Sequence, residues 1–221
     1  MLSIVATNDG SDTILNSVLN STYHSINGAM QESMHVFIKE GFNKLNNKTG
    51  SVSILEIGYG TGLNAWLTYL EVLKNPSIDV EYLALEPFPI ENELIQQLNF
   101  PLIFNNSNEG ISFNQFQIEQ MHGTLNNRFK LKIVKEKWEH FNTINLFDLI
   151  YYDAFSPGVQ PDMWSSFAMK KVSKSLKTDG IWVTYCAKGE VRRNLIFNGL
   201  RLEKIEGPPG KRHMLRATKS S

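Results

Sequence analysis

Hydrophobic and polar positions follow two rhythms along this chain. Short apolar runs, typical of strands buried on both faces, are separated by segments in which apolar residues return at the spacing of a helix. The apolar runs predict strands at residues 52–57, 79–86, 129–134, 146–153, 180–186, 200–206 and 212–218. The helical rhythm predicts longer helices at residues 62–74, 90–98, 162–177 and 188–197.

This alternation of strand and helix favours a doubly wound, Rossmann-like α/β fold, in which helices cover both faces of a largely parallel sheet. Gly207-Pro-Pro-Gly210 joins the last two predicted strands. These strands would form an antiparallel hairpin at the C-terminal end of a seven-stranded, mostly parallel sheet. A length of 221 residues suits one such domain.

The region before the first core strand has a different pattern. Residues 1–50 predict an N-terminal extension packed on the core, with short strands around the turn signal Asp9-Gly-Ser-Asp12 and a helix. The helix would present one apolar face, made by Met34, Phe37, Ile38, Phe42 and Leu45. Residues 51–221 would form the core domain, with a polar insertion near 105–123 that contains a short helix over 113–121.

A glycine-rich turn lies between the first core strand and the first core helix. Gly58, Gly60 and Gly62 allow positive φ and leave bare main chain for a ligand, and the helix start adds free N–H groups. The dinucleotide fingerprint is G-x-G-x-x-G, whereas this turn reads G-x-G-x-G and follows Glu56. A carboxylate there would repel a pyrophosphate but would suit the positively charged S-adenosylmethionine. A purely structural turn is the alternative.

Two acidic residues end predicted strands where α/β sheets bind ligands. Glu86 stands where such folds hydrogen-bond a ribose diol, and Asp153 would face the glycine turn across the switch point of the sheet. Pro157 stiffens the loop after Asp153, and Phe155 and Trp164 offer apolar faces that could hold a base. The alternatives are a solvated strand end for Glu86 and structural roles in the core for Asp153 and Trp164.

Several further motifs extend this pattern. The full set is Tyr23-His-Ser with Gly28-Ala, Glu56 to Asn64, Asp153-Ala-Phe-Ser-Pro with Pro161-Asp-Met-Trp164, Thr184-Tyr with Gly189-Glu-Val-Arg-Arg193, and Gly207-Pro-Pro-Gly-Lys-Arg212. Together these motifs resemble the methyltransferase domain of the MnmC family over nearly the whole chain. The resemblance implies a class I methyltransferase that uses S-adenosyl-L-methionine. Its acceptor would be the aminomethyl nitrogen of 5-aminomethyl-(2-thio)uridine at the tRNA wobble position.

The resemblance also implies a role for each matching residue. The cofactor would lie among Glu56, Gly58, Gly60, Gly62, Glu86, Glu136, Gln31 and Glu32. Within this set Glu86 would bind the ribose and Glu136 the adenine, with Glu139 as the rival of Glu136. Asp153 would be the catalytic residue. The substrate would contact Phe155, Pro157 and Trp164, and its RNA phosphates would contact Lys211 and Arg212. The bifunctional members of this family also carry an oxidoreductase domain that binds FAD. This sequence has no second glycine-rich fingerprint and no length for such a domain, so a stand-alone methyltransferase is expected.

Charge supports an RNA partner. The chain has 22 basic and 22 acidic residues, but residues 188–221 hold nine Lys or Arg against three Glu. Such a patch would neutralise phosphates, and a single-stranded anticodon loop can splay a base into a pocket. A helix and a hairpin with ordinary solvated basic faces are the alternative.

Other classes are less consistent with the sequence. No apolar run approaches the roughly 20 residues of a membrane span, and no export signal begins the chain, so a cytoplasmic protein is expected. One cysteine, Cys186, excludes an internal disulfide, and no His or Cys pattern predicts a metal site. Two alternatives stay open: a methyl- or aminopropyltransferase for a small amine, and a non-catalytic cofactor- or RNA-binding protein.

Overall fold

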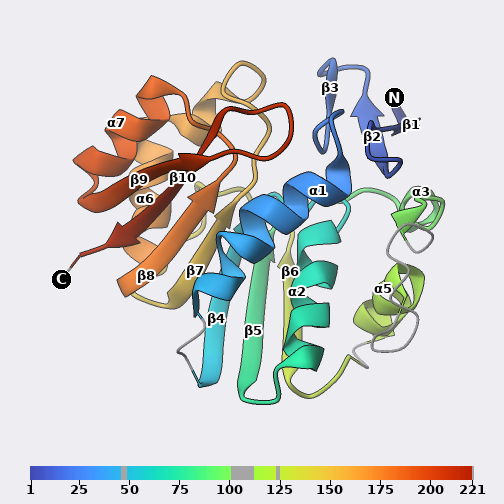
Figure 1. Cartoon of the computed structure of the whole chain (residues 1–221), viewed down its shortest axis with the longest axis horizontal. Helices are drawn as coiled ribbons and strands as arrows, with labels where there is room; N and C mark the ends of the chain where they lie inside the picture. The colour runs from blue at the N-terminus through green and yellow to red at the C-terminus, as the bar shows by residue number, and fades with distance from the viewer. Residues whose placement is uncertain (46–48, 101–111, 123–124, 221) are drawn as a thin grey trace.

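The structure of the chain is a computed structural model that describes residues 1–45, 49–100, 112–122 and 125–220. Its centre is a seven-stranded sheet in the order β6–β5–β4–β7–β8–β10–β9 (Figure 1). The strands are β4 (Gly50–Ile57), β5 (Ile78–Leu85), β6 (Phe129–Val134), β7 (Phe147–Tyr152), β8 (Leu176–Thr184), β9 (Leu200–Glu206) and β10 (His213–Lys219). Neighbouring strands are parallel except that β10 runs antiparallel to β8 and β9. The predicted sheet with its C-terminal hairpin is confirmed.

The switch point of the sheet lies between β4 and β7. These strands are neighbours although β5 and β6 come between them in sequence. Glu56 on β4 is therefore aligned with Ala84 of β5 on one side and with Tyr151 of β7 on the other. Chain connections diverge at such a point and leave a crevice beyond the carboxyl ends of the strands. Here the connections that follow Ile57 and Tyr152 frame that crevice.

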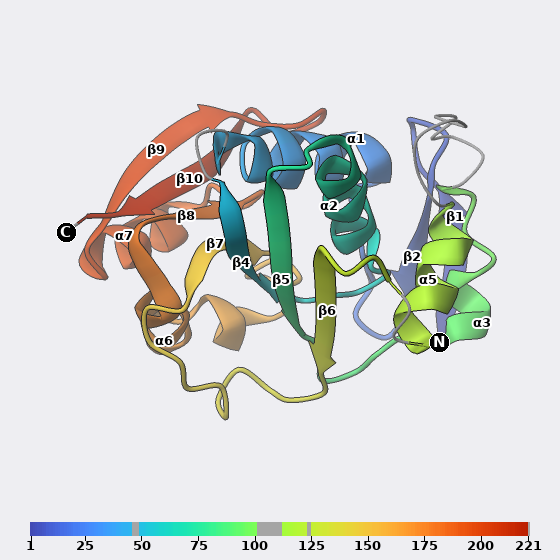
Figure 2. The ribbon, with the colours of Figure 1, turned by 90° about the horizontal axis from the view of Figure 1, so that it is seen from below.

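Helices cover both faces of this sheet. Figure 2 shows α1 (Ala29–Ser33) and α2 (Leu63–Lys74) on one face and α6 (Ser166–Ser175) on the other. The side chains of α7 (Gly189–Phe197) join the same core as those of α6. Two apolar cores result, one with Phe37 and Trp66 and one with Trp164, Trp182 and the single cysteine, Cys186. Burial on both faces explains why β7 is buried at all six positions.

The helix predicted from Met34 onward is instead broken into pieces. After α1 comes a π-helix, η1 (Met34–Lys39), and then a 3₁₀ turn, η2 (Phe42–Leu45). Gly41 makes the break possible, because a Cβ there would fall 2.4 Å from the Phe37 carbonyl oxygen. The chain thus turns tightly against the sheet, and the predicted apolar face is buried in separate segments.

Two further helices differ from the predictions. The predicted helix at 162–177 is divided into a 3₁₀ turn, η3 (Pro161–Trp164), and α6. Ser165 separates them, because its Oγ accepts a hydrogen bond from the Ala168 N–H and caps α6. The predicted helix at 90–98 is limited to α3 (Asn92–Ile95).

The N-terminal segment contains the short strands that the sequence predicts. β1 (Leu2–Ala6), β2 (Asp12–Asn16) and β3 (Ser21–Thr22) form a separate antiparallel sheet. The short helix predicted near 113–121 is α5 (Phe113–His122). The rest of the predicted insertion, at 105–111 and 123, lies outside the described residues, and the division into two domains stays a prediction. In the described part of the chain, no helix has the length and apolar character needed to cross a membrane.

Candidate active site

Three glycines with positive φ shape the turn between β4 and α2. The φ angle is 87° at Gly58, 54° at Gly60 and 82° at Gly62, a region that favours glycine. A Cβ at Gly58 would lie 2.7 Å from the Asp153 carbonyl oxygen, so the turn packs directly on the end of β7. A Cβ at Gly60 would meet only the Tyr23 ring, at 3.2 Å. Gly60 therefore presents bare main chain to the crevice.

Glu86 holds this turn from the end of the neighbouring strand. Its Oε2 accepts a hydrogen bond from the Gly60 N–H at 3.1 Å, and its Oε1 accepts one from the Phe88 N–H at 3.0 Å. The two main-chain donors fix the carboxylate in one orientation. Each carboxylate oxygen keeps a lone pair for a ligand hydroxyl, as a ribose would require.

Asn64, in the first turn of α2, joins two carboxylates. Its Nδ2 donates one hydrogen bond to Glu56 Oε1 and one to Asp153 Oδ2, both at 2.9 Å. An amide nitrogen has two hydrogens, so each carboxylate takes one. Glu56 is fully buried.

Burial changes the acidity of both carboxyl groups. Burial raises the pKa of Glu56 well above the usual value. The hydrogen bond from Asn64 lowers this pKa, and the charge of the nearby Asp153 raises it further. The pKa of Asp153 is raised to about 7, first by burial and then by the charge of Glu32, while Asn64 and Lys211 lower it. Asp153 therefore titrates near neutral pH.

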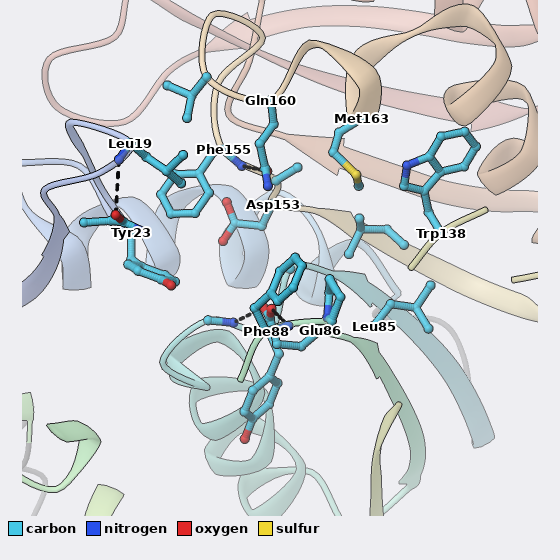
Figure 3. Close-up of a pocket in the computed structure, with 18 of the residues that line it drawn as sticks. Leu19, Tyr23, Leu85, Glu86, Phe88, Trp138, Asp153, Phe155, Gln160 and Met163 are labelled. Atoms are coloured by element: carbon cyan, nitrogen blue, oxygen red, sulfur yellow. Dashed lines mark hydrogen bonds between the residues drawn. The ribbon is translucent and has the colours of Figure 1, made fainter. Parts of the chain in front are cut away.

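Asp153 opens into a cavity of about 730 Å³ (Figure 3). Its walls come from the small N-terminal sheet, the glycine turn, and the segments that follow β5, β6 and β7. In Figure 3 the Asp153 carboxylate points into the space between Tyr23, Phe155 and Glu86. The volume is in the range of pockets that hold a cofactor-sized ligand.

The predicted cofactor residues divide into two groups. Gly58, Gly60, Glu86 and Glu136 line the cavity, as does Glu139, the rival of Glu136. Glu56, Gly62, Gln31 and Glu32 are not among its lining residues. Gln31 is exposed and Glu32 is buried next to Lys211, so neither reaches the cavity.

Of the three loop residues predicted to contact the substrate, two lie outside the cavity lining. Phe155 lines the cavity, whereas Pro157 and Trp164 do not. Trp164 is 2% exposed, and its Nε1 donates a hydrogen bond to the Phe155 carbonyl oxygen at 2.7 Å. Its ring packs edge-on against that of Tyr152, with 5.0 Å between centroids. Trp164 is therefore an anchor of the loop in the core and is not available to hold a base.

The C-terminal basic residues are also divided by the structure. Lys211 forms an ion pair with Glu32, Arg216 forms ion pairs with Glu40 and Glu203, and Lys219 donates to the Leu176 carbonyl oxygen. The exposed basic residues of this segment are Lys188, Arg192, Arg193, Arg201, Lys204 and Arg212. Lys211 is thus partly buried and paired with Glu32, whereas Arg212 is exposed, as a phosphate contact would require.

Three residues of the site were not predicted individually. Asn64 bridges the carboxylates, Gln160 accepts a hydrogen bond from the Phe155 N–H at 3.1 Å, and the Tyr23 ring packs edge-on against Phe155 at 4.9 Å. Asn64 and Tyr23 lie within the motifs that carry the family resemblance, so the sequence holds a signal for both. Nothing in the sequence distinguishes Gln160 from an ordinary loop residue.

Comparison with known proteins now decides the family. The family model for S-adenosyl-L-methionine-dependent methyltransferases matches residues 104–220, which is more than half of the chain. The chain belongs to this family. S-adenosyl-L-methionine is accordingly the methyl donor of this methyltransferase. The open glycine turn, the oriented Glu86 carboxylate and the size of the cavity all fit such a cofactor.

Curated relatives cover most of this methyltransferase. The tRNA 5-methylaminomethyl-2-thiouridine biosynthesis bifunctional protein MnmC of Campylobacter fetus is 26% identical over 94% of this chain and 34% of that protein. The protein of the same name from Leptospira interrogans is 28% identical over 87% of this chain and 32% of that protein. The expected resemblance to MnmC is confirmed, and this chain spans about a third of the length of these relatives.

Solved structures agree on the fold. The crystal structure of MNMC2 from Aquifex aeolicus has a TM-score of 0.79 at 24% identity and covers all of this chain and 72% of that one. Spermidine synthase from Thermotoga maritima has a TM-score of 0.55 at 17% identity, over 95% of this chain and 69% of that one. At these identities the likeness shows the fold alone. The predicted class I methyltransferase fold is confirmed.

Proposed function

We propose that this methyltransferase transfers the methyl group of S-adenosyl-L-methionine to the aminomethyl nitrogen of 5-aminomethyl-(2-thio)uridine at the wobble position of tRNA. The observation that carries the proposal is the Asp153 carboxylate, which points into the cavity beside the glycine turn and has a pKa of about 7. The names of the curated relatives, which state the biosynthesis of 5-methylaminomethyl-2-thiouridine in tRNA, support this choice of substrate.

In this proposal Gly60, Glu86 and Glu136 hold the cofactor, which supplies an electrophilic methyl group on a sulfonium. The acceptor amine must present a free lone pair. A simple alkylamine has a pKa of about 10.4, so it is almost fully protonated at pH 7 and loses its proton at a cost of about 4–5 kcal/mol. The site therefore has to orient a scarce neutral amine.

Asp153 suits that task as an acceptor of hydrogen bonds. Its carboxylate does not lower the pKa of the amine, because it stabilises the ammonium form. It accepts N–H bonds, aims the nitrogen lone pair and stabilises the positive charge left on the methylated amine. The surrounding apolar side chains, Leu85, Phe155 and Met163, limit solvation and disfavour the ammonium form, so the proton leaves to water.

The rings beside Asp153 offer a place for the uracil. Tyr23 and Phe155 line the cavity as an edge-to-face pair. A base that is splayed out of a single-stranded loop stacks on aromatic faces of this kind. Phe88 and Val18, which are 69% and 81% exposed, stand at the rim and can contact neighbouring nucleotides.

The test compares acceptors for a labelled methyl group. The acceptors are tRNA that carries 5-aminomethyl-2-thiouridine, the same tRNA without the aminomethyl group, and putrescine or spermidine. Label is expected only on the first, and nucleoside analysis should find it at the wobble position.

Two outcomes would overturn the proposal. Label on the polyamine alone would favour a transferase for small amines. The fold likeness to spermidine synthase does not decide between these two acceptors. Cofactor binding without transfer to any acceptor would favour a non-catalytic binding protein.

A further inference from the structure

A partly buried ion pair joins two distant segments of the chain near Asp153. Glu32, in α1, contacts Lys211 Nζ through its Oε1, and its Oε2 accepts a hydrogen bond from the Ser25 N–H at 2.8 Å. The Glu32 side chain is 8% exposed and that of Lys211 is 30% exposed. Both carboxylate oxygens are thus engaged, and the carboxylate has one fixed position.

Contacts lead from this pair to the loop of Asp153. Lys211 Nζ lies 4.2 Å from the centroid of the Tyr185 ring, and the Tyr185 hydroxyl donates a hydrogen bond to the Ala154 carbonyl oxygen at 2.8 Å. Ala154 directly follows Asp153. A displacement of Lys211 therefore reaches the catalytic loop through one ring and one hydrogen bond.

The turn that carries Lys211 also rests directly on the N-terminal segment. A Cβ at Gly210 would fall 2.1 Å from Asn27 Nδ2, so only glycine permits this approach. Asn27 and Glu32 belong to the same N-terminal segment. The turn between β9 and β10 is therefore seated by close packing at Gly210 and by charge at Lys211.

Charged and titratable groups face Asp153 from four elements. Glu56 of β4 lies on the other side of Asn64, Glu32 belongs to α1, Lys211 to the β9–β10 turn, and Tyr185 follows β8. The pKa of Asp153 is raised by Glu32 and lowered by Lys211. The two members of the ion pair thus act on Asp153 with opposite signs.

We propose that Glu32 and Lys211 are positioning residues for Asp153, which hold the catalytic loop through Tyr185 and set the charge balance in which Asp153 keeps its carboxylate. The proposal rests on the catalytic role of Asp153 in the proposed function. It gives Lys211 a task inside the enzyme instead of a contact with an RNA phosphate.

The test is a titration of Asp153 by ¹³C NMR, in the protein labelled on its aspartate carboxyl carbons. Asp153→Asn assigns the signal by its disappearance. Lys211→Met should raise the pKa of Asp153, because a stabilising cation is lost and Glu32 is left uncompensated. Glu32→Gln should lower it, because a repelling anion is lost while an acceptor for Ser25 remains. The double variant should fall between the two single variants, and Lys211→Arg, which keeps the cation, should titrate like the wild type.

Two results would overturn the proposal. If both single variants shift the pKa of Asp153 in the same direction, they act through loosened packing and not through charge. If neither moves it by more than about 0.5 unit, the charges do not reach Asp153. The titration needs no acceptor, so it succeeds or fails separately from the choice of tRNA as substrate.

Single-turnover methylation adds a second readout. A raised pKa leaves less of Asp153 ionised near pH 7, so Lys211→Met should slow methylation severalfold there, and the rate should recover at higher pH. The KM for tRNA should stay unchanged. Arg212→Met, at the exposed neighbouring position, is the matched comparison: it removes a proposed RNA contact, so it should raise the KM for tRNA without a shift of the pH profile. A raised KM without a pH shift in Lys211→Met would instead assign Lys211 to the RNA.

Discussion

Two walls of the active site are built in different ways. The glycine-turn wall consists of residues 56–64 with Glu86, and it is shaped mainly by main-chain atoms. The clamp wall consists of Glu32, Lys211 and Tyr185, and Glu32 and Lys211 are 179 positions apart in sequence. In our proposals the first wall meets the cofactor, whereas the second, whose residues are not in the cavity lining, acts on Asp153 from outside.

The difference shows how tolerant each wall should be to substitution. A side chain added at Gly58 or Gly62 would collide with protein atoms, and one added at Gly60 would enter the cavity. At all three positions it would also have to adopt positive φ. A side chain removed from the clamp wall leaves the main chain of the sheet in place. We therefore expect all-or-none effects in the first wall and graded, pH-dependent effects in the second.

The largest effect is expected at Gly60. Gly60→Val should abolish binding of S-adenosyl-L-methionine in calorimetry, because the side chain would enter the cavity beside Tyr23. Gly199→Val is the matched control, because Gly199 has a φ of 80° but no atom within 4 Å of its Cβ position. It bears similar backbone strain and should bind normally. Unaltered binding by a folded Gly60→Val protein would refute the cofactor position.

Asp153 stands between the two walls and should give the next largest effect. Asp153→Asn should lower single-turnover methylation by about 10² or more while much of the cofactor affinity remains. If orientation is the main role of Asp153, the loss of rate at high pH should be smaller in Asp153→Asn than in Asp153→Ala. The control is Asp162→Asn, which changes another acidic residue in the lining of the same cavity and should keep a rate near that of the wild type. Methylation at the wild-type rate by Asp153→Ala would remove Asp153 from the chemistry.

Trp164 tests the anchoring of the loop between the walls. Trp164→Ala should destabilise the fold by about 3–5 kcal/mol, because it leaves a cavity in the core and frees the Phe155 carbonyl oxygen. Trp164→Phe keeps most of the volume and should cost about 1–2 kcal/mol for the lost hydrogen bond and atoms. Denaturant unfolding measures both. A fully stable Trp164→Ala that loses tRNA binding would restore the base-holding role.

The raised pKa of Asp153 predicts a smaller, pH-dependent change in stability. Between its ordinary value of 3.8 and its folded value of about 7, the native carboxyl holds a proton that the unfolded chain has lost. Stability of the wild type should therefore fall as pH rises through this window. In thermal melts the Tm of Asp153→Asn relative to the wild type should rise by a few degrees between about pH 4 and about pH 7. Above pH 7 the difference in Tm should stay constant. A constant difference across this range would mean that Asp153 is not perturbed.

The smallest effect separates Arg212 from Lys211. Arg212→Ala should weaken tRNA binding and reduce its salt slope by roughly 0.7–0.9, as for one lost phosphate contact. Lys211→Ala should leave the slope unchanged, because its ammonium is paired with Glu32. Filter binding over a range of salt concentrations measures both. An equal loss of slope in the two variants would place Lys211 on the RNA.

The sequence by itself determined the features that depend on neighbouring residues. Strand β4, the glycine turn and the start of α2 follow from an apolar run, three glycines and a helical rhythm within one short stretch. The end of β7 at Asp153 was predictable for the same reason. The motif resemblance added the family, because such motifs record a local backbone shape and the side chains that it presents.

Only the tertiary structure decided which side chains meet across the fold. Trp164 has the same loop sequence whether its ring faces the core or the cavity, and packing against Tyr152 decides for the core. Lys211 belongs to a basic segment, yet the seating of the β9–β10 turn on α1 directs it to Glu32. Glu32 and Lys211 meet because α1 and the β9–β10 turn are packed side by side in the fold, and no local pattern of residues encodes that packing.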